Sequence, residues 1–322
     1  MLVLSRSDVE ALLDPDALID AVGSAMADLS AGAASMPPRI AATIPERDAL
    51  LGAMPAYLPS AGVLACKLVD VFPGNDAQGM DTHQAVIMCF DPENGAPLAL
   101  MDGTAITAHR TAAGSALATR LLAREDARVL TIVGTGVQAR MHASYLPRVR
   151  TFEEEVRVAG RTPERVSGLA SALTAEGRPA RAYRTIEEAV RGADVVCLCT
   201  HSPFPVIRRE WLAAGAHVNS VGFNTEGPEV DEPTVREARV VVEYRPSSLA
   251  PPPSGPVDLQ GLGPDDVVEI GEIVLGEHPG RTSRDELTLY RSGGVAVQDA
   301  AAAGLVLRRA AKDGRVGTRI EI

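Results

Sequence analysis

The chain has few aromatic side chains and more acidic than basic residues, which limits the partners that it could bind. Aromatic residues make up 3% of the 322 residues, and 31 Lys and Arg stand against 42 Asp and Glu, for a formal net charge of −11. Binding to nucleic acid requires clustered cations for the phosphates and, on single strands, aromatic platforms for the bases. The composition therefore argues against a nucleic-acid partner.

Long apolar runs are also missing. No stretch of the sequence reaches the roughly 18 apolar residues that a membrane-spanning helix requires. The first ten residues, MLVLSRSDVE, become charged too soon for a signal peptide. We therefore expect a cytoplasmic protein with no membrane partner.

Cysteine is scarce, with four residues at positions 66, 89, 197 and 199. Neither C-x-x-C nor H-x-x-x-H occurs, so the sequence predicts no metal site. Cys197 and Cys199 form a C-x-C pair in an apolar run, where alternate residues of a strand share one face. We interpret this pair as small buried core residues in a reduced compartment.

The length and ordinary globular composition suggest about two domains. In the first hundred residues, Ser7 with Glu10 is typical of a capping box, and Asp14 with Pro15 begins a second helix. Turn-rich segments then separate short β-rich runs, which predicts a mostly antiparallel sheet. These runs cover residues 62–71, 85–90 and 97–101, and an Ala-rich helix over 104–123 follows them.

From residue 128 onward, apolar strands alternate with helices. This alternation predicts a doubly wound parallel sheet of the Rossmann type. The expected strands cover residues 128–133, 156–159, 195–200, 216–221 and 240–243.

Two later segments complete the predicted organisation. Residues 245–256 hold five prolines, which excludes a regular helix and indicates a surface crossing. An Ala-rich helix over 295–311 is expected to pack back on the first domain, making that domain discontinuous and α+β. The predicted boundaries are 1–119 with 296–322 for the first domain, and 120–295 for the Rossmann domain.

The strongest local motif is Gly134-Thr135-Gly136-Val137-Gln138-Ala139, which fits G-x-G-x-x-A. It follows a predicted strand and opens a helix, which is the context that dinucleotide binding requires. Gly134 permits the tight turn, and Gly136 lets the backbone approach the pyrophosphate at the helix N-terminus. We therefore predict that the loop, including Val137 and Gln138, binds a nicotinamide dinucleotide.

The end of the second Rossmann strand bears on the choice of coenzyme. An NAD site usually carries Asp or Glu there, but this chain has Arg161 followed by Thr162. An arginine can pair with a 2′-phosphate, and a threonine can add a hydroxyl donor. The sequence favours NADP(H), with NAD(H) possible; the alternative is that Arg161 is a solvated charge.

Three further candidates stand where Rossmann strands end. Thr200 and His201 follow one strand, and Val221 follows the next. Ligands of open parallel sheets bind at the carboxyl ends of the strands. We therefore predict that these three residues contact the cofactor.

Several separated motifs, in the same order along the chain, resemble the ornithine cyclodeaminase/mu-crystallin family. The resemblance covers nearly the whole chain, and its Thr-His-Gln-Ala run is closer to the mu-crystallin branch. The motifs are Pro38-Arg39, Met54-Pro55-Ala56-Tyr57, Lys67 with Pro73-Gly74-Asn75, Thr82-His83-Gln84-Ala85, Met101-Asp102-Gly103, Ile106-Thr107 and Arg110-Thr111-Ala112-Ala113.

The resemblance implies an oxidoreductase with a Rossmann domain and a substrate domain that forms a homodimer. Members of the family carry out hydride chemistry at the α-carbon of an amino acid. They include cyclodeaminases, alanine dehydrogenases, and reductases of ketimines or cyclic imines, and mu-crystallin also binds thyroid hormone. The first predicted domain would then bind the substrate and dimerise, and the second would bind the dinucleotide.

The matching positions imply that Arg39, Lys67 and Arg110 hold the carboxylate of a small substrate derived from an amino acid. Guanidinium forks bind a carboxylate through two hydrogen bonds, and Lys adds a point charge. The alternative is salt bridging at the surface, although Lys67 lies in an apolar run, where a charge needs a partner.

The resemblance also implies contacts to the cofactor. Thr82 and His83 match positions near the nicotinamide and phosphates, and Thr82 is a candidate substrate contact as well. His83 could instead be a core histidine. Arg110 with Thr111, and Ser292, match further cofactor positions.

The chain departs from the cyclodeaminases at two places. Their aspartate near the strand that ends at Val221 aligns with Asn224, which cannot act as a carboxylate base. Their glutamate before Met-Pro is missing, because residues 50–53 are Leu-Leu-Gly-Ala. Glu226, two residues after Asn224, leaves that alignment open.

These features favour NAD(P)H-dependent reduction of an imine of a small α-amino acid. Lys67, Arg110 and Asn224 are the candidate catalytic residues, and Lys67 or a bound water would supply the proton. A cyclodeaminase or an alanine-type dehydrogenase is the alternative enzyme. A small-ligand binding protein that needs the cofactor but has no turnover is the alternative of another class.

Overall fold

The computed structural model describes residues 1–222 and 224–321 and divides the chain into two compact units. Unit 1 comprises Met1–Arg110 with Gly294–Ile322, and unit 2 comprises Thr111–Gly293. The sequence analysis placed the boundaries at 119/120 and 295/296, so the first one differs by nine residues. The first boundary falls inside the continuous helix α3 (Gly103–Leu122), which gives the sequence no turn to mark it.

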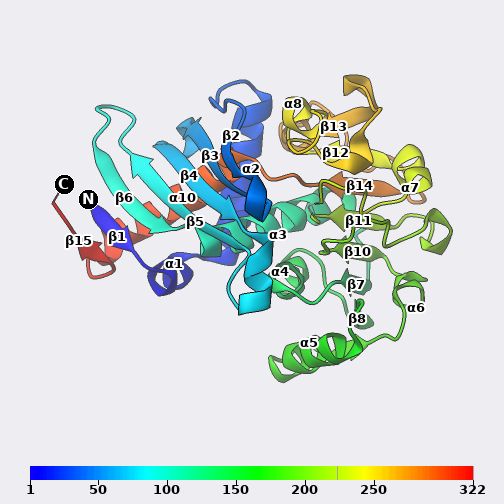
Figure 1. Ribbon diagram of the computed structural model, residues 1–322. Coiled ribbons are helices and arrows are strands. Elements are labelled where there is room, and N and C mark those ends of the chain that lie inside the picture. Colours follow the sequence, from blue (N-terminus) through cyan, green and yellow to red (C-terminus); the bar gives the residue numbers. More distant parts are fainter. Residues whose placement is uncertain (223, 322) are drawn as a thin grey trace. The chain divides into compact units, whose positions relative to one another are not determined.

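Unit 1 is built on a sheet with the strand order β15-β1-β6-β5-β4-β3-β2 (Figure 1). All neighbouring pairs are antiparallel except β1 and β6, which confirms the predicted mostly antiparallel sheet. The sequence analysis did not predict β1, β2, β3 or β15. The strands are β1 (Leu2–Leu4), β2 (Ile40–Ile44), β3 (Ala49–Leu58), β4 (Val63–Val71), β5 (His83–Phe90), β6 (Pro97–Asp102) and β15 (Thr318–Arg319).

Along the chain, helices α1 (Arg6–Leu12) and α2 (Pro15–Ser30) follow β1 and come before the other strands of this sheet. Asp14 caps α2 as predicted, since its carboxylate accepts a hydrogen bond from the amide of Ala17. The predicted capping box of Ser7 with Glu10 is wrong, because Ser5 and Asp8 form the box instead. The same spacing fits both pairs, and the earlier pair caps a helix whose buried residues are Val9 and Leu12.

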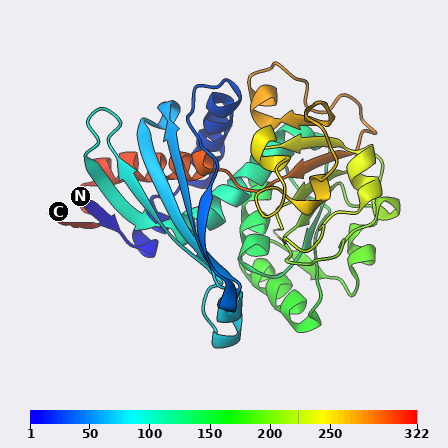
Figure 2. The same ribbon diagram turned by 45° about the horizontal axis from the view of Figure 1, so that its top comes forward.

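Helix α10 (Ala296–Asp313) packs against α2 and the strands β3 and β4, as the Ala-rich tail predicted (Figure 2). Small residues allow a close approach: a Cβ at Gly304 would lie 2.9 Å from the Cβ of Ala61. The covered face of the sheet carries buried residues such as Met54, Ile87 and Met101. The opposite face exposes large apolar side chains of Ile40, Leu51, Tyr57, Leu64, Leu68, Val86 and Leu98.

Unit 2 contains a fully parallel sheet with the order β13-β12-β14-β11-β10-β7-β8-β9. The sheet begins at β7 and extends through β8 and β9 on one side and through β10 and β11 on the other, and β14 later enters between β11 and β12. This parallel, doubly wound arrangement confirms the Rossmann fold. Strands β9, β13 and β14 were not predicted. The strands are β7 (Val129–Val133), β8 (Glu155–Ala159), β9 (Ala180–Ala182), β10 (Val195–Leu198), β11 (His217–Ser220), β12 (Arg239–Val242), β13 (Val267–Glu269) and β14 (Thr288–Arg291).

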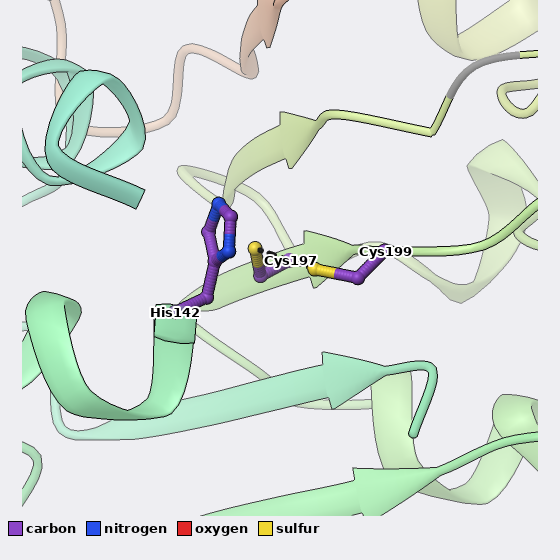
Figure 3. A group of neighbouring side chains, drawn as sticks. All are labelled: His142, Cys197 and Cys199. Carbon is purple, nitrogen blue, oxygen red and sulfur yellow. Dashed lines mark hydrogen bonds between the residues drawn. The ribbon is translucent and has the colours of Figure 1, made fainter. Parts of the chain in front are cut away.

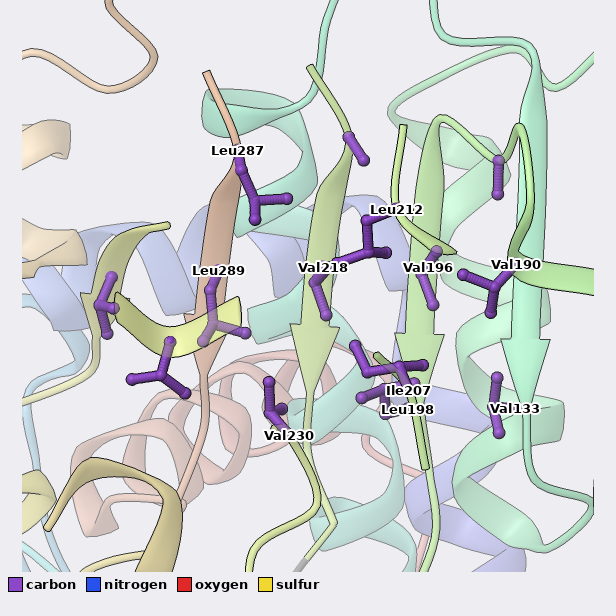
Figure 4. Packing of buried hydrophobic residues seen from close by; sticks show 14 of the residues in the cluster. Val133, Val190, Val196, Leu198, Ile207, Leu212, Val218, Val230, Leu287 and Leu289 are labelled. Atoms are coloured by element: carbon purple, nitrogen blue, oxygen red, sulfur yellow. The ribbon is translucent and has the colours of Figure 1, made fainter. Parts of the chain in front are cut away.

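The core of unit 2 is formed by the apolar side chains that these strands turn toward one face (Figure 4). Val133, Leu198, Val218 and Leu289 come from four neighbouring strands and are buried together. The remaining helices of unit 2 are α4 (Val137–Tyr145), α5 (Pro163–Ala175), α6 (Ile186–Val190), α7 (Glu232–Glu237), α8 (Arg245–Ser248) and α9 (Ile270–Val274).

Short 3-10 helices and one proline-rich crossing complete the chain. The crossing predicted for residues 245–256 begins with the single helical turn α8, which tolerates Pro246 because the amides of a first helical turn have no partner within the helix. Among the helices in the described part of the chain, none is long and apolar enough to span a bilayer. The 3-10 helices are η1 (Pro45–Arg47), η2 (Pro59–Ala61), η3 (Pro73–Gln78), η4 (Leu146–Arg148), η5 (Arg209–Trp211), η6 (Val257–Leu259) and η7 (Pro264–Asp266).

Candidate functional site

The glycine loop of unit 2 connects β7 to α4 and has the geometry that a dinucleotide requires. Gly134 has a φ of +125°, and a Cβ there would lie 2.4 Å from the carbonyl oxygen of Cys199. Gly136 is the N-cap of α4, and a Cβ on it would meet nothing within 4 Å. The helix N-terminus thus faces open space where phosphate oxygens could accept from its amides.

Two side chains of the same loop bear on this fit. Val137 is 62% exposed, and the buried Oε1 atom of Gln138 has no hydrogen-bond partner within residues 1–222 and 224–321. A buried amide oxygen without a donor costs about 1–3 kcal/mol. A hydroxyl-bearing ligand at the loop would satisfy it, so the residues present fit a dinucleotide.

The side chains at the end of β8 are free to meet a ligand. Arg161 is exposed and makes no hydrogen bond or ion pair with any described residue. Thr162 is the N-cap of α5, but its side chain caps no amide. Both groups that the sequence assigned to the adenosine ribose are therefore unengaged.

A buried glutamate, which the sequence analysis missed, joins the carboxyl ends of β10 and β11. Glu229 is 3% exposed, and its Oε1 accepts hydrogen bonds from the amide (2.8 Å) and hydroxyl (2.6 Å) of Thr200. Its Oε2 accepts from the Ser220 hydroxyl (2.7 Å) and the Gly222 amide (2.9 Å). Glu229 therefore holds Thr200 and the segment after β11, including Val221, in place.

Asn224 also bridges the two loops. Its Nδ2 donates to the carbonyl oxygen of His201 at 2.9 Å, and its Oδ1 accepts from the Glu226 amide at 2.7 Å. Both ends of this amide are thus bound to backbone, which suits a positioning residue. Phe223, the residue before Asn224, lies outside the described residues.

Ser292 follows β14 and is anchored by a second buried glutamate. Its hydroxyl donates to Glu243 Oε1 at 2.8 Å, and the Gly293 amide donates to Glu243 Oε2 at 2.9 Å. Thr111, the predicted cofactor contact next to Arg110, is a buried residue of α3. An acid directly after an apolar strand, as Glu243 follows β12, is a signal that could have identified this anchor from the sequence.

In unit 1, two of the three predicted cations meet on one buried aspartate. Lys67 of β4 and Arg110 of α3 are 3% and 6% exposed. Lys67 Nζ lies 2.7 Å from Asp299 Oδ2, and Arg110 Nε lies 3.1 Å from Asp299 Oδ1. Asp299, in the first turn of α10, is 2% exposed and was missed by the sequence analysis.

Arg39, the third cation, approaches the same place through the turn before α10. Its Nη2 donates to the Gly294 carbonyl oxygen at 2.7 Å. A Cβ on Gly294 would lie 2.8 Å from both terminal nitrogens of Arg110. Arg110 Nη1 also donates to Gln298 Oε1 at 2.9 Å. The structure thus brings Arg39, Lys67 and Arg110 together.

The electrostatics of this group favour an anion. Burial, followed by the nearby charges of Arg110 and Arg39, lowers the pKa of Lys67 to about 8, while Asp299 acts in the opposite direction. Lys67 and Arg110 share the single carboxylate of Asp299, so this buried cluster carries more positive than negative charge. A ligand carboxylate would compensate that charge.

Thr82 and His83 lie farther along the same sheet. Their side chains are 3.1 Å apart, between Thr82 Oγ1 and His83 Nδ1. His83 pairs with Val71 of β4, four residues beyond Lys67, so it shares the face of Lys67. Four residues of strand correspond to roughly 13 Å, so this pair is separate from the three cations.

Comparisons with known proteins agree with this geometry. A model of the ornithine cyclodeaminase/mu-crystallin family matches residues 1–314. The mouse ketimine reductase mu-crystallin is 37% identical over 293 residues, covering 90% of each chain.

Two solved structures resemble the whole chain. The Δ1-pyrroline-2-carboxylate reductase of Thermococcus litoralis, in complex with NADH and L-proline, is 34% identical with a TM-score of 0.93 and coverage of 99% of this chain and 100% of that one. An archaeal alanine dehydrogenase dimer with bound NAD is 32% identical, with a TM-score of 0.91 and coverage of 100% and 99%.

Proposed function

This chain belongs to the ornithine cyclodeaminase/mu-crystallin family, and we propose that it reduces the C=N bond of an imine derived from a small α-amino acid. It is a nicotinamide-dependent oxidoreductase. The observation that carries the proposal is the group of Arg39, Lys67 and Arg110 around Asp299, which has the charge to hold a carboxylate.

The proposed reaction requires a hydride, a clamp for the carboxylate and a proton. When bound, a reduced nicotinamide would supply the hydride for the imine carbon. Arg39 and Arg110 would hold the substrate carboxylate, and Lys67 would donate a proton to the imine nitrogen. A pKa of about 8 leaves Lys67 mostly protonated at neutral pH yet able to release its proton. Asp299 would orient Lys67 and Arg110 together.

A steady-state assay tests this function. The protein is mixed with NADH or NADPH and a panel of cyclic ketimine acids, with matching imines that lack the carboxyl group as controls. We expect cofactor oxidation with the acids and a much lower kcat/KM without the carboxyl group. No oxidation across the panel would overturn the proposal.

The relatives suggest two other activities, and further assays on the same protein distinguish them from imine reduction. Ammonia release from ornithine without net cofactor turnover would indicate a cyclodeaminase, which the amide of Asn224 and residues 50–53 argue against. NADH-coupled amination of pyruvate would indicate an alanine dehydrogenase, the activity named for one of the similar structures. Tight cofactor-dependent ligand binding with no turnover would indicate a binding protein.

We further propose a preference for NADP(H) over NAD(H). Arg161 and Thr162 support it, because both stand at the end of β8 with no competing partner among the described residues. A guanidinium can form two hydrogen bonds with a 2′-phosphate. The similar structures were solved with NADH or NAD, so the ratio of kcat/KM for the two coenzymes is the deciding measurement.

We also propose a homodimer formed through the uncovered face of the unit 1 sheet. The exposed apolar residues Leu51, Leu64, Leu68 and Val86 support it, since such a patch on a soluble protein marks an interaction site. Light scattering of the wild type and of Leu68→Lys tests it, with a dimer expected only for the wild type. A cytoplasmic location stays a prediction of the sequence.

A further inference from the structure

Three potential metal ligands meet in unit 2 behind the glycine loop (Figure 3). Cys197 and Cys199 come from the end of β10, and His142 comes from helix α4, far from them in the sequence. The two sulfurs and one imidazole nitrogen all lie within 4.8 Å of one another. No spacing rule could have identified this group, because its ligands come from separate elements.

The distance between the sulfurs fits a shared cation better than a disulfide. Cys197 Sγ and Cys199 Sγ are 3.7 Å apart. Two thiolates on one tetrahedral cation, at bond lengths of about 2.3 Å, would be about 3.8 Å apart. A disulfide would require a separation of about 2.0 Å, so the sulfurs would have to approach considerably.

The imidazole is oriented as metal-binding imidazoles usually are. His142 Nδ1 lies 2.7 Å from the carbonyl oxygen of Gln138, which can only accept, so Nδ1 carries the hydrogen. Nε2 then has the lone pair, which accepts a hydrogen bond from the hydroxyl of Ser115 at 2.9 Å, so a cation bound at Nε2 would displace this hydrogen bond. A ring held by a backbone carbonyl through one nitrogen is the usual outer-shell arrangement of a histidine ligand.

The thiols themselves are unsuited to act as nucleophiles. Cys197 is buried and Cys199 is only partly exposed, so reagents in solvent have little access to either sulfur. A protonated thiol reacts slowly with oxidants and electrophiles. A thiophilic cation can displace such protons, because the bond to the metal replaces the bond to hydrogen.

We propose that His142, Cys197 and Cys199 form a site for one thiophilic divalent cation such as Zn²⁺ or Cd²⁺. Binding releases the two thiol protons to solvent and leaves two thiolates and one neutral imidazole on the cation. A fourth position stays open to water or to Ser115. The site is separate from the proposed carboxylate group, and it stands whether or not the chain reduces imines.

The position of the site connects it to the dinucleotide loop. The Cys199 carbonyl oxygen occupies the space beside Gly134, and His142 lies in the helix that Gly136 caps. A cation would join the end of β10 to α4, the two elements that enclose this loop. We therefore expect cation binding to raise the thermal stability of the protein.

Titration with Cd²⁺ tests the proposal. Untagged, fully reduced protein is titrated with Cd²⁺ while the ultraviolet thiolate-to-cadmium charge-transfer band is recorded. We expect one Cd²⁺ per chain for the wild type and for the control C66S, whose cysteine lies in unit 1. C197S and C199S are expected to lose at least tenfold in affinity and most of the band.

Two outcomes would overturn the proposal. One is the absence of a thiolate band at stoichiometric Cd²⁺, and the other is a band that C197S and C199S retain in full. Each serine variant is checked for folding by its circular dichroism and by coenzyme binding. If one fails to fold, the other variant and His142→Gln give the same comparison. Thermal melts with and without Cd²⁺ should show an upward shift for the wild type and C66S only.

Discussion

Two buried carboxylates, one in each unit, are held by different kinds of partner. Glu229 in unit 2 accepts hydrogen bonds from backbone amides and hydroxyls of Thr200, Ser220 and Gly222. Asp299 in unit 1 is instead paired with the cations Lys67 and Arg110. The first carboxylate is saturated by neutral donors of its own chain and serves as an anchor, whereas the second leaves cationic groups with capacity for a ligand.

The contrast teaches that burial of a charge does not by itself identify a catalytic group. The donors aimed at Glu229 come from the last residue of β11 and from the segments that follow β10 and β11, so these hydrogen bonds stabilise the fold. Two buried cations on the one carboxylate of Asp299 leave a net positive charge, which costs stability unless an anion binds. Substitutions in the two groups should therefore affect different quantities.

Replacing Arg110 should have the largest effect on catalysis. Arg110→Met removes a buried guanidinium that would hold the substrate carboxylate, and such losses cost about 4 kcal/mol, or about a thousandfold in kcat/KM. Steady-state kinetics with a cyclic ketimine acid measures it. Arg315→Met, at an exposed arginine, is the control. An R110M enzyme with wild-type kcat/KM would contradict the assignment.

Replacing Glu229 should mainly reduce stability. In Glu229→Gln an amide NH₂ replaces one acceptor and faces donors, which should lower the free energy of unfolding by about 2–3 kcal/mol. Denaturant unfolding measures the loss, with the exposed Glu226→Gln on the same loop as control. If E229Q kept wild-type stability but lost activity, the distinction between anchor and catalytic group would fail.

Replacing Arg161 should change coenzyme preference by a smaller factor. Arg161→Leu removes one charge-assisted contact to a 2′-phosphate, so kcat/KM for NADPH should fall about tenfold to a hundredfold. The value for NADH should change little. The control is Arg165→Leu, because Arg165 is likewise exposed and lies nearby, in the first turn of α5. An unchanged NADPH/NADH ratio would show that Arg161 is only a solvated charge.

A change in pH should have the smallest effect per step, because it acts through the protonation of one group, Lys67. Above pH 8, kcat/KM should fall about tenfold per pH unit as Lys67 loses its proton. The unfolded chain keeps that proton up to the ordinary pKa of 10.5, so the contribution of Lys67 to stability rises between pH 8 and 10.5. Activity and stability should thus change in opposite directions. Lys67→Arg should abolish this falling limb, and its persistence would assign it to another group.

Much of the fold could be predicted because its signals are local. The strand, glycine turn and helix around Gly134 are adjacent in sequence, and each is specified by its own residues. Strand β3 was missed because it contains Gly52 and Pro55, which are uncommon within strands, and β2 was missed because its five residues give only a short signal. The helix over Arg110 was predicted, but the division of the chain inside it was not.

The candidate site was predicted only in part. The resemblance proposed Arg39, Lys67 and Arg110, which the structure brings together, whereas the contacts of Thr200 and Val221 with a cofactor stay predictions. Asp299, Glu229 and Glu243 were missed, because the role of an acid depends on which distant donors face it.

The sequence alone determined the two classes of sheet, the glycine loop and the set of cations. These follow from periodicity, from glycine at positions that exclude a side chain, and from motifs in a fixed order. Only the tertiary structure decided that Lys67 and Arg110 share Asp299, that Glu229 joins two strand ends, and that His142 meets Cys197 and Cys199. Such groupings join segments that are far apart in the chain, and only packing brings them within hydrogen-bonding distance.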